Sequence, residues 1–280
     1  MRHILILMVA FFCMVSNSNA QLQEGFESVI NLDPPDESGL VVPSGWLGFL
    51  RSEPPGFTGV FQGVPPDGMG NGGGFLAHEG PDNSYMGVSF TSAGSFTIND
   101  VISTWMVSPV VQLEDGGVFS FYTRTVPESL FPDSLYVRMS TNGGSADVGG
   151  GASSIGDFTT ELFAINPLLM PGEYPEEWTK FEIELSGIGE PVFGRIALHY
   201  FVPDLSMNAN AVGIDTLTYE GPLKCMAGDI NQDDEINLLD VQPFVSLIAE
   251  EEFQCEGDLN GDGAVNLLDV SPFVDLLVTQ

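Results

Sequence analysis

A 21-residue motif occurs twice near the C-terminus of this chain of 280 residues. The first copy, GDINQDDEINLLDVQPFVSLI, begins at Gly228, and the second, GDLNGDGAVNLLDVSPFVDLL, begins at Gly257; 13 of the 21 positions are identical. Counted from the Asp after the first glycine, both copies place Asp or Asn at positions 1, 3, 5, 9 and 12. This spacing is typical of a calcium-binding loop, so the motif predicts two calcium sites.

The predicted ligands follow this spacing in each loop, with side-chain oxygens at positions 1, 3, 5, 9 and 12 and a backbone carbonyl at position 7. In the first loop the set is Asp229, Asn231, Asp233, Glu235, Asn237 and Asp240. In the second loop the set is Asp258, Asn260, Asp262, Ala264, Asn266 and Asp269. The alternative is two acidic turns without metal, which the repetition of the match disfavours.

Position 6 of such a loop forms a tight turn, for which glycine is the best residue. The second loop has Gly263 there, whereas the first has Asp234. An Asp adopts the left-handed backbone conformation only at some cost. We therefore expect the first calcium site to be the weaker one.

Apolar residues after each loop recur at helical spacing, which predicts one amphipathic helix in each copy. We expect one face of each helix to be buried against the other copy; the residues are Leu239, Val241, Phe244, Val245, Ile248, Leu268, Val270, Phe273, Val274 and Leu277. Pro243 and Pro272 fit if a helix begins directly after position 12, or if the helix kinks at the proline.

The two loop–helix repeats resemble the dockerin family, whose tandem calcium repeats lack the first helix of an EF-hand. The resemblance covers residues 225–280 and implies a small α-helical domain with two Ca²⁺ ions. Known dockerins attach exported proteins to cohesin partners, and small hydroxyl residues beside position 12 make much of that contact. Here the neighbouring residues are Leu238, Leu239, Leu267 and Leu268, which either contact another kind of partner or belong to the core.

The N-terminal sequence MRHILILMVAFFCMVSNSNA has a short basic start, an apolar run and small residues before Gln21. This pattern predicts a secretory signal peptide over residues 1–20. No later segment is both apolar and long enough to span a bilayer. We therefore expect an exported chain, secreted or held at the cell surface by a partner.

Two cysteines follow the predicted signal peptide, Cys225 and Cys255, each shortly before a loop. In an exported protein such a pair predicts a disulfide, and the alternative is two free thiols. On the chain-entropy model, closing a loop of about 30 residues contributes about 3–4 kcal/mol.

The chain is strongly acidic, with 39 Asp and Glu against 7 Lys and Arg. No Lys or Arg follows Lys224, whereas residues 225–280 contain 13 acidic residues. Without a bound cation, the acidic side chains of this segment repel one another. Nucleic acid and anionic membranes are poor partners for a chain with such a negative electrostatic field.

Residues 21–222 form a second predicted domain, in which no long amphipathic helix is evident. Apolar residues alternate with polar ones in 135–140, 180–185 and 196–202, which predicts strands. Gly- and Pro-rich segments separate the strands, notably those that begin at Gly63 and Gly143. The pattern predicts a mainly β fold, an antiparallel β-sandwich of jelly-roll type.

A series of short motifs runs along this second domain. They are EGFES from Glu24, PSGW ending at Trp46, FLAHEGPDNSY from Phe75, STWMVSPVVQL from Ser103, FSFYTRT from Phe119, LYVRMSTNGG from Leu135, WTKFEIELSG from Trp178, GRIALHYFV from Gly194 and VGIDTLTY from Val212. In this order they resemble the choice-of-anchor J domain, related to cleaved-adhesin and MAM-like jelly rolls. Such domains are extracellular bacterial modules joined to different C-terminal attachment signals.

No catalytic constellation stands out in the sequence. His78 and His199, the histidines beyond the predicted signal peptide, belong to no zinc-protease or nucleophile motif. We expect His78 in a loop and His199 partly exposed on a strand. Glu182 and Glu184 alternate outward on a strand, where solvated charge is the default. The tryptophans either stack on sugar or pack in the core, and the core is favoured; they are Trp46, Trp105 and Trp178.

These patterns favour an exported, non-enzymatic binding or structural protein. Its sandwich is expected to contact protein or glycan, and its calcium-folded tail to dock to a cohesin-like or other extracellular protein. The alternative is a polysaccharide hydrolase, or an accessory component, recruited through the tail. A cleft lined by two carboxylates about 5–10 Å apart would favour the hydrolase.

Overall fold

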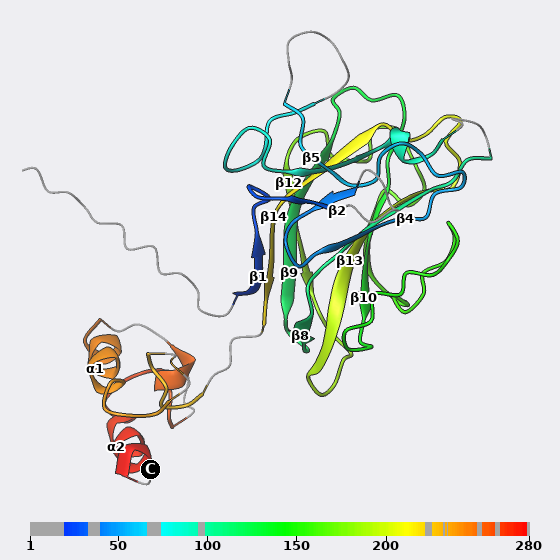
Figure 1. The fold of residues 1–280 in the computed structure, drawn as a ribbon. Helices are drawn as coiled ribbons and strands as arrows, with labels where there is room; N and C mark the ends of the chain where they lie inside the picture. Colours follow the sequence, from blue (N-terminus) through cyan, green and yellow to red (C-terminus); the bar gives the residue numbers. More distant parts are fainter. Residues whose placement is uncertain are drawn as a thin grey trace, which may run out of the picture. The chain divides into compact units, whose positions relative to one another are not determined.

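The computed structural model describes residues 20–32, 40–65, 74–94, 99–221, 226–231, 233, 235–250, 254–260 and 264–278. The chain divides into two compact units, Ala20–Pro222 and a second unit that contains Leu223–Gln280 (Figure 1). The first unit is built from antiparallel strands, and the second contains two α-helices. In its described part the chain is therefore mainly β, as predicted, and none of the helices described there has the length and apolarity to cross a membrane.

The first sheet of the larger unit has six strands in the order β12-β9-β14-β6-β5, with β1 also paired to β14. The strands are β1 (Ala20–Glu24), β5 (Phe61–Gln62), β6 (Met86–Ser89), β9 (Val118–Thr125), β12 (Thr179–Glu184) and β14 (Ala211–Glu220). Strand β14 lies in the middle, where Val212 pairs with Val88 of β6 and with Thr125 of β9. A 3-10 turn, η1 (Phe90–Ser92), directly follows β6.

The second sheet also has six strands, in the order β11-β10-β13-β7-β4, with β8 paired to β13. The strands are β4 (Leu47–Leu50), β7 (Ile102–Val107), β8 (Val111–Leu113), β10 (Leu135–Ser140), β11 (Thr160–Ile165) and β13 (Val192–Val202). The short strands β2 (Ile30–Leu32) and β3 (Leu40–Val42) form a separate pair.

The main core lies between the two sheets, because successive side chains of a strand point to opposite faces. Phe121 and Ile214 of the first sheet belong to the same buried cluster as Val137 and Leu198 of the second. The predicted alternation is confirmed at the buried residues Leu135, Val137, Met139, Ile183, Ile196, Leu198, Tyr200 and Val202. The two sheets thus form a β-sandwich.

The smaller unit contains α1 (Val241–Glu250), α2 (Val270–Val278) and the 3-10 turn η2 (Cys255–Gly257). Each helix begins directly after position 12 of its loop, which is the first of the two alternatives that fit Pro243 and Pro272. The carbonyl of Asp240 accepts the N–H of Phe244 at 2.9 Å, and that of Asp269 accepts the N–H of Phe273 at 3.0 Å. The proline of each copy is the third helical residue, where no acceptor within the helix is needed.

The core of the smaller unit differs in part from the prediction. Its buried residues are Ile230, Phe244, Leu247, Val265 and Phe273. The predicted core residues Leu239, Val241, Val245, Leu268, Val270 and Val274 are instead exposed. Phe244, Leu247 and Ile248 form one i, i+3, i+4 stripe, and Val245 lies about 100° around the helix from it. A short helix that packs against one neighbour buries only one such stripe.

The two repeats also pack crosswise through a glycine that precedes each loop. A Cβ on Gly228 would lie 2.9 Å from Leu276 of α2. In the other copy, a Cβ on Gly257 would lie 3.2 Å from Leu247 of α1. Each helix therefore covers the start of the other loop, and the missing side chain makes room for this contact.

Several predicted features lie outside the described residues. They are residues 1–19 of the predicted signal peptide, Cys225, the side chain of Cys255, Asp234, Asp262 and Gly263. The disulfide, the contrast at position 6 and the ligand at 262 therefore stay predictions. Ala20, the last residue of the predicted signal peptide, is the first residue of β1 and pairs with Glu220.

Candidate functional site

The carboxylate at position 12 closes each predicted calcium loop. In the first loop, Oδ1 of Asp240 accepts the N–H of Asn231 at 3.0 Å, and Oδ2 accepts the N–H of Asn237 at 2.8 Å. Asp240 is fully buried. Its backbone therefore starts the helix, while its side chain turns back and joins positions 3 and 9 of the loop.

The second loop is closed in the same way. Oδ1 of Asp269 accepts the N–H of Asn260 at 3.0 Å, and Oδ2 accepts the N–H of Asn266 at 2.9 Å. Asp269 is also fully buried. The two loops are thus closed by the same hydrogen bonds, from the backbone N–H groups of positions 3 and 9 to the Asp side chain of position 12.

Other side chains of the first loop bend the backbone around themselves. Oδ1 of Asp229 and Oδ1 of Asn231 both accept the N–H of Asp233, at 3.1 and 3.0 Å. Oδ1 of Asp233 accepts the N–H of Glu235 at 3.0 Å. Each of these oxygens has more than one lone pair, so these bonds leave capacity to bind a cation.

The donor set fits calcium in its chemistry, since the side chains offer carboxylate and amide oxygens. Within the described residues, no group of three or more His, Cys, Asp or Glu side chains is arranged to hold a metal. Two of the five side-chain ligands predicted in the first loop are amides, Asn231 and Asn237, and the second loop includes Asp262, outside the described residues. The two calcium sites therefore stay a prediction.

The leucine pair beside position 12 is exposed in both copies. Leu238 is 79% and Leu267 77% exposed, and Leu239 and Leu268 are exposed as well. The interpretation that these side chains form core is therefore wrong. The smaller unit presents the same apolar residues to solvent twice.

His199 of β13 is buried, contrary to the expectation that it is partly exposed. Only 2% of it is accessible, and its ring stacks on that of Trp105, 3.6 Å away. Trp105 Nε1 donates to Oγ of Ser103 at 3.1 Å, and this hydroxyl lies 2.9 Å from Nε2 of His199. Val148 and Phe158 pack against Trp105, so a long loop covers this face of the second sheet. Among the described residues, no hydrogen-bond partner reaches Nδ1 of His199, where the acid of a catalytic triad would lie.

His78 lies in the segment before β6, as predicted, and Asp215 holds that segment against β14. Oδ2 of Asp215 accepts the N–H of His78 at 2.7 Å and that of Glu79 at 3.3 Å, and Oδ1 accepts the N–H of Thr216 at 2.6 Å. Burial raises the pKa of Asp215 to about 6, against the effect of these hydrogen bonds. The ring of His78 stacks on Tyr122 at 3.6 Å. This contact is long-range, so the sequence gives no signal for it.

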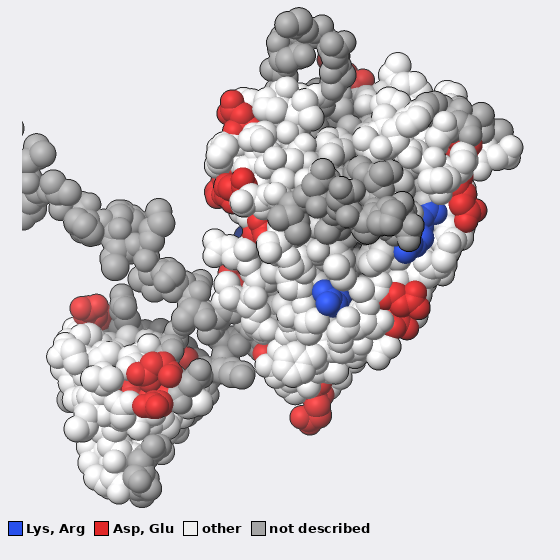
Figure 2. Space-filling model, in the orientation of Figure 1, with Lys and Arg blue, Asp and Glu red and all other residues white. Residues whose placement is uncertain are grey.

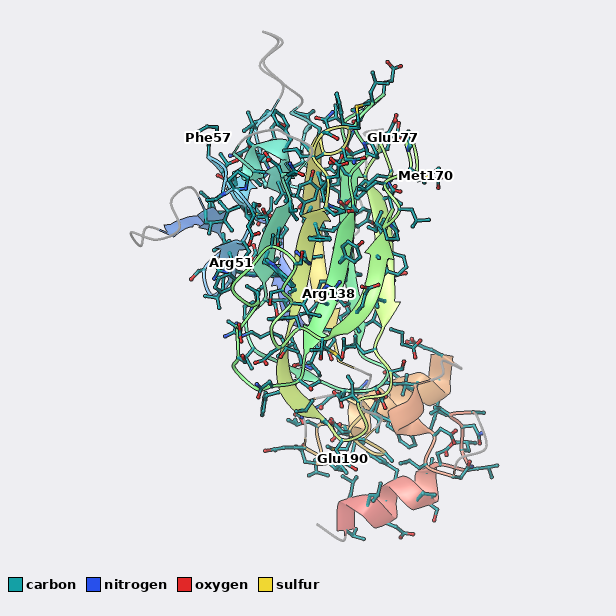
Figure 3. All side chains as sticks on the ribbon, turned by 90° about the vertical axis from the view of Figure 1, so that its right-hand side faces the viewer. Arg51, Phe57, Arg138, Met170, Glu177 and Glu190 are labelled. Carbon is teal, nitrogen blue, oxygen red and sulfur yellow. The ribbon has the colours of Figure 1, made fainter. Side chains whose placement is uncertain are left out.

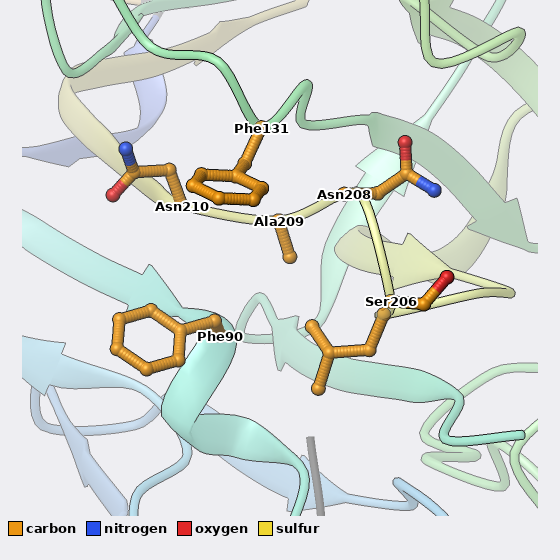
Figure 4. Close-up of a pocket in the computed structure, with 7 residues that line it drawn as sticks. Phe90, Phe131, Ser206, Asn208, Ala209 and Asn210 are labelled. Atoms are coloured by element: carbon orange, nitrogen blue, oxygen red, sulfur yellow. The ribbon is translucent and has the colours of Figure 1, made fainter. Parts of the chain in front are cut away.

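Two adjoining pockets open where β6, β14 and the loop before β10 meet. One has a volume of 570 Å³ and the other 350 Å³, and Phe90 and Asn210 line both. The larger is also lined by Phe61, Val64, Gly74, Phe75, Tyr85, Gly87, Ser89, Thr91, Val126, Ala211 and Val212. The smaller is completed by Phe131, Leu205, Ser206, Asn208 and Ala209 (Figure 4). No sequence pattern marks these pockets, because their walls come from distant segments.

A third pocket, of 360 Å³, is lined by Arg124, Pro127, Glu176, Glu177 and Trp178. Glu177 and Met170 lie at one end of the sandwich, and Glu190 lies at the other (Figure 3). Trp178 is only half-buried, whereas Trp46 and Trp105 are core residues, as favoured. Glu182 and Glu184 are exposed, as expected.

No family model matches the chain, and no curated protein matches it. Among solved structures, two cleaved adhesin domains of Lys-gingipain from Porphyromonas gingivalis are similar, each with 15% identity and a TM-score of 0.40. They cover 71% and 72% of this chain and 97% and 99% of their own. A xylan-binding domain from Paenibacillus barcinonensis has 15% identity and a TM-score of 0.35, over 72% of this chain and 93% of its own.

Proposed function

We propose that this chain is an exported, non-enzymatic binding protein. Its β-sandwich binds an extracellular glycan or protein, and its small C-terminal unit is a calcium-folded docking tail. The observation that carries the proposal is the equal closure of two loops by Asp240 and Asp269. Two loops rich in oxygen ligands that close in the same way support a binding role.

Calcium in this proposal has a structural role, with metal affinity coupled to folding. One ion would be held by oxygens of the first loop, from Asp229, Asn231, Asp233, Glu235, Asn237 and Asp240. A second ion would be held by oxygens of the second loop, from Asp258, Asn260, Asp262, Ala264, Asn266 and Asp269. The ions supply positive charge to a segment with 13 acidic residues and no Lys or Arg. Acidic groups are also spread over the visible surface, where basic groups are sparse (Figure 2).

The docking role is supported by the exposed leucines of both repeats. The smaller unit gains little stability from four exposed leucines, Leu238, Leu239, Leu267 and Leu268. We propose that they contact an extracellular protein, cohesin-like or of another kind. The same proposal includes three further points: membership of the dockerin and choice-of-anchor J families, jelly-roll connectivity of the sandwich, and a disulfide between Cys225 and Cys255.

One observation favours the hydrolase alternative. The third pocket combines two carboxylates, Glu176 and Glu177, with the half-buried ring of Trp178. These glutamates are neighbours in sequence, whereas a glycosidase places its two carboxylates on either side of the scissile bond. If Glu177→Gln abolished the release of reducing sugar from a polysaccharide that the wild type cleaves, the alternative would replace the binding role.

Calorimetry of the full chain with and without a chelator tests the calcium proposal. We expect chelation to remove the unfolding transition of the smaller unit and to leave that of the sandwich in place. Asp258→Ala should lower the number of bound calcium ions by one in a calorimetric titration. A tail transition that chelator leaves unchanged would contradict the proposal.

A further inference from the structure

We infer that the two pockets sharing Phe90 and Asn210 form one groove that binds a neutral sugar chain. The inference rests on the proposed binding function and names the ligand class of the sandwich. We call these two pockets together the loop-end groove. Its volumes of 570 and 350 Å³ lie within the usual range of ligand pockets, about 300–1,000 Å³.

The groove exists because small residues face outward on two paired strands. The core contains Met86 and Val88 of β6 and Val212 and Ile214 of β14, so the residues next to them in sequence point to the other face. Those residues are cross-strand partners: Gly87 with Gly213, and Ser89 with Ala211. Two successive pairs without a large side chain leave a hollow on the outer face of the sheet.

Aromatic rings line this hollow on one side. A Cβ on Gly87 would lie 2.4 Å from the ring of Phe61, and one on Gly213 would lie 2.2 Å from the ring of Phe75. The ring of Tyr85 follows, with its centroid 4.9 Å from that of Phe75. The glycines thus let flat rings lie close to the sheet, where they form the apolar wall of the groove.

Phe90 and Phe131 offer exposed ring surface to a ligand. Phe90 comes from η1 and Phe131 from the loop before β10, and both line the smaller pocket (Figure 4). Phe90 is 42% and Phe131 43% exposed. The electron-rich face of an aromatic ring suits the C–H face of a sugar ring. A sugar also needs polar partners at its edge.

Asn210 supplies a fixed polar group between the two pockets. Its backbone N–H donates to Oδ1 of the buried Asp133 at 2.8 Å, and its carbonyl accepts the N–H of Phe90 at 2.9 Å. Its Nδ2 donates to Oγ of Ser129 at 3.0 Å. In the described part of the chain no hydrogen bond reaches its Oδ1, so this oxygen can accept a bond from a ligand hydroxyl. The hydroxyls of Ser89 and Thr91, 2.6 Å apart, add further partners.

The charge of the lining selects a neutral ligand. Among the described residues that line the two pockets there is no Asp, Glu, Lys or Arg, in a chain with 39 acidic and 7 basic residues. Arg124 lies 4.8 Å from the centroid of the Phe75 ring but is not among the described lining residues, and the strongly acidic chain repels a polyanion. Hydroxyl and amide groups beside aromatic rings suit a polyhydroxylated ring better than a purely apolar peptide.

Titration calorimetry of the full chain with neutral hexasaccharides tests the inference. The probes are cellohexaose, xylohexaose, mannohexaose and maltohexaose, with hexagalacturonate as the anionic comparison. We expect at least one neutral probe to bind, and Phe90→Ala and Phe131→Ala each to weaken it about tenfold or more. Phe57→Ala is the matched control, because Phe57 is 73% exposed and lines neither pocket. Hexagalacturonate should not bind.

Three results would overturn the inference. They are no binding of any neutral probe at about 5 mM, binding that neither Phe90→Ala nor Phe131→Ala weakens, and capture of an apolar phage-displayed peptide that Phe90→Ala abolishes and no saccharide competes. None of these three results would contradict the calcium-dependent folding of the tail. Because all groove residues belong to the sandwich, sugar binding should persist in chelator. Failure of the groove and failure of the tail are thereby distinguished.

Discussion

The rings of Phe244 and Phe273 lie 4.4 Å apart, with an angle of 42° between their planes. They occupy the same position of two repeats, since 273 − 244 equals the offset of 29 between the copies. Both are buried, and they join helices of only ten and nine residues. Helices of this length are not stable alone in water, so the contact between the repeats contributes to keeping them folded.

Replacing Phe244 by Ala should unfold or strongly destabilise the smaller unit. Loss of a buried phenylalanine typically costs about 3–5 kcal/mol. Differential scanning calorimetry should show the tail transition lowered or lost and the sandwich transition unchanged. Val245→Ala is the control, because Val245 is exposed, and should change stability by less than about 0.5 kcal/mol. Equal effects of the two variants would argue against the observed core.

The variant Asp240→Asn should weaken the first loop selectively. Asp240 accepts backbone N–H groups with both oxygens, so an amide in its place sets an NH₂ group against one N–H. A buried donor left without an acceptor costs about 1–3 kcal/mol. We expect a calorimetric titration to show weaker calcium binding at one of two sites. Glu250→Gln, at an exposed position, should leave both sites unchanged, and loss at both sites would contradict a local role.

The pKa of Asp215, raised by burial to about 6, predicts a pH dependence of the sandwich. This carboxyl ionises more easily in the unfolded chain, where its pKa is about 3.9. Its contribution to stability is therefore complete below about pH 4 and is lost as the pH rises to about 6, by at most about 1.4 kcal/mol per pH unit. Urea unfolding should show that the free energy of unfolding of the wild type falls, relative to that of Asp215→Asn, as the pH rises from about 4 to about 6. Parallel profiles would refute the raised pKa.

His199 predicts the opposite pH dependence. Burial lowers its pKa well below the usual value, and the positive charge of Arg138 acts in the same direction. The unfolded chain takes up this proton near pH 6.5, so the contribution is present above about pH 6.5 and is lost as the pH falls. His199→Phe should flatten the acid side of the stability profile. In NMR spectra of the folded protein, a ring signal of His199 that titrates near pH 6.5 would contradict burial.

The sequence by itself determined those features that depend on neighbouring residues. Alternation at 135–140 marked which side chains of β10 face the core, and the structure buries Leu135, Val137 and Met139. The sequence left two alternatives after position 12, a helix that begins directly there or a kink at the proline, and each helix does begin directly there. Such signals are local, so a single segment contains all the information they need.

The tertiary structure alone decided what covers each face. Periodicity did not show that Val245 is exposed while Leu247 is buried, because that depends on how two short helices meet. Nor did it show that a distant loop would cover the face of β13 that carries His199. The loop-end groove likewise arises where Ser89 and Ala211, 122 residues apart (211 − 89), become cross-strand partners. Burial and cavities are properties of pairs of segments, and only folding brings those segments together.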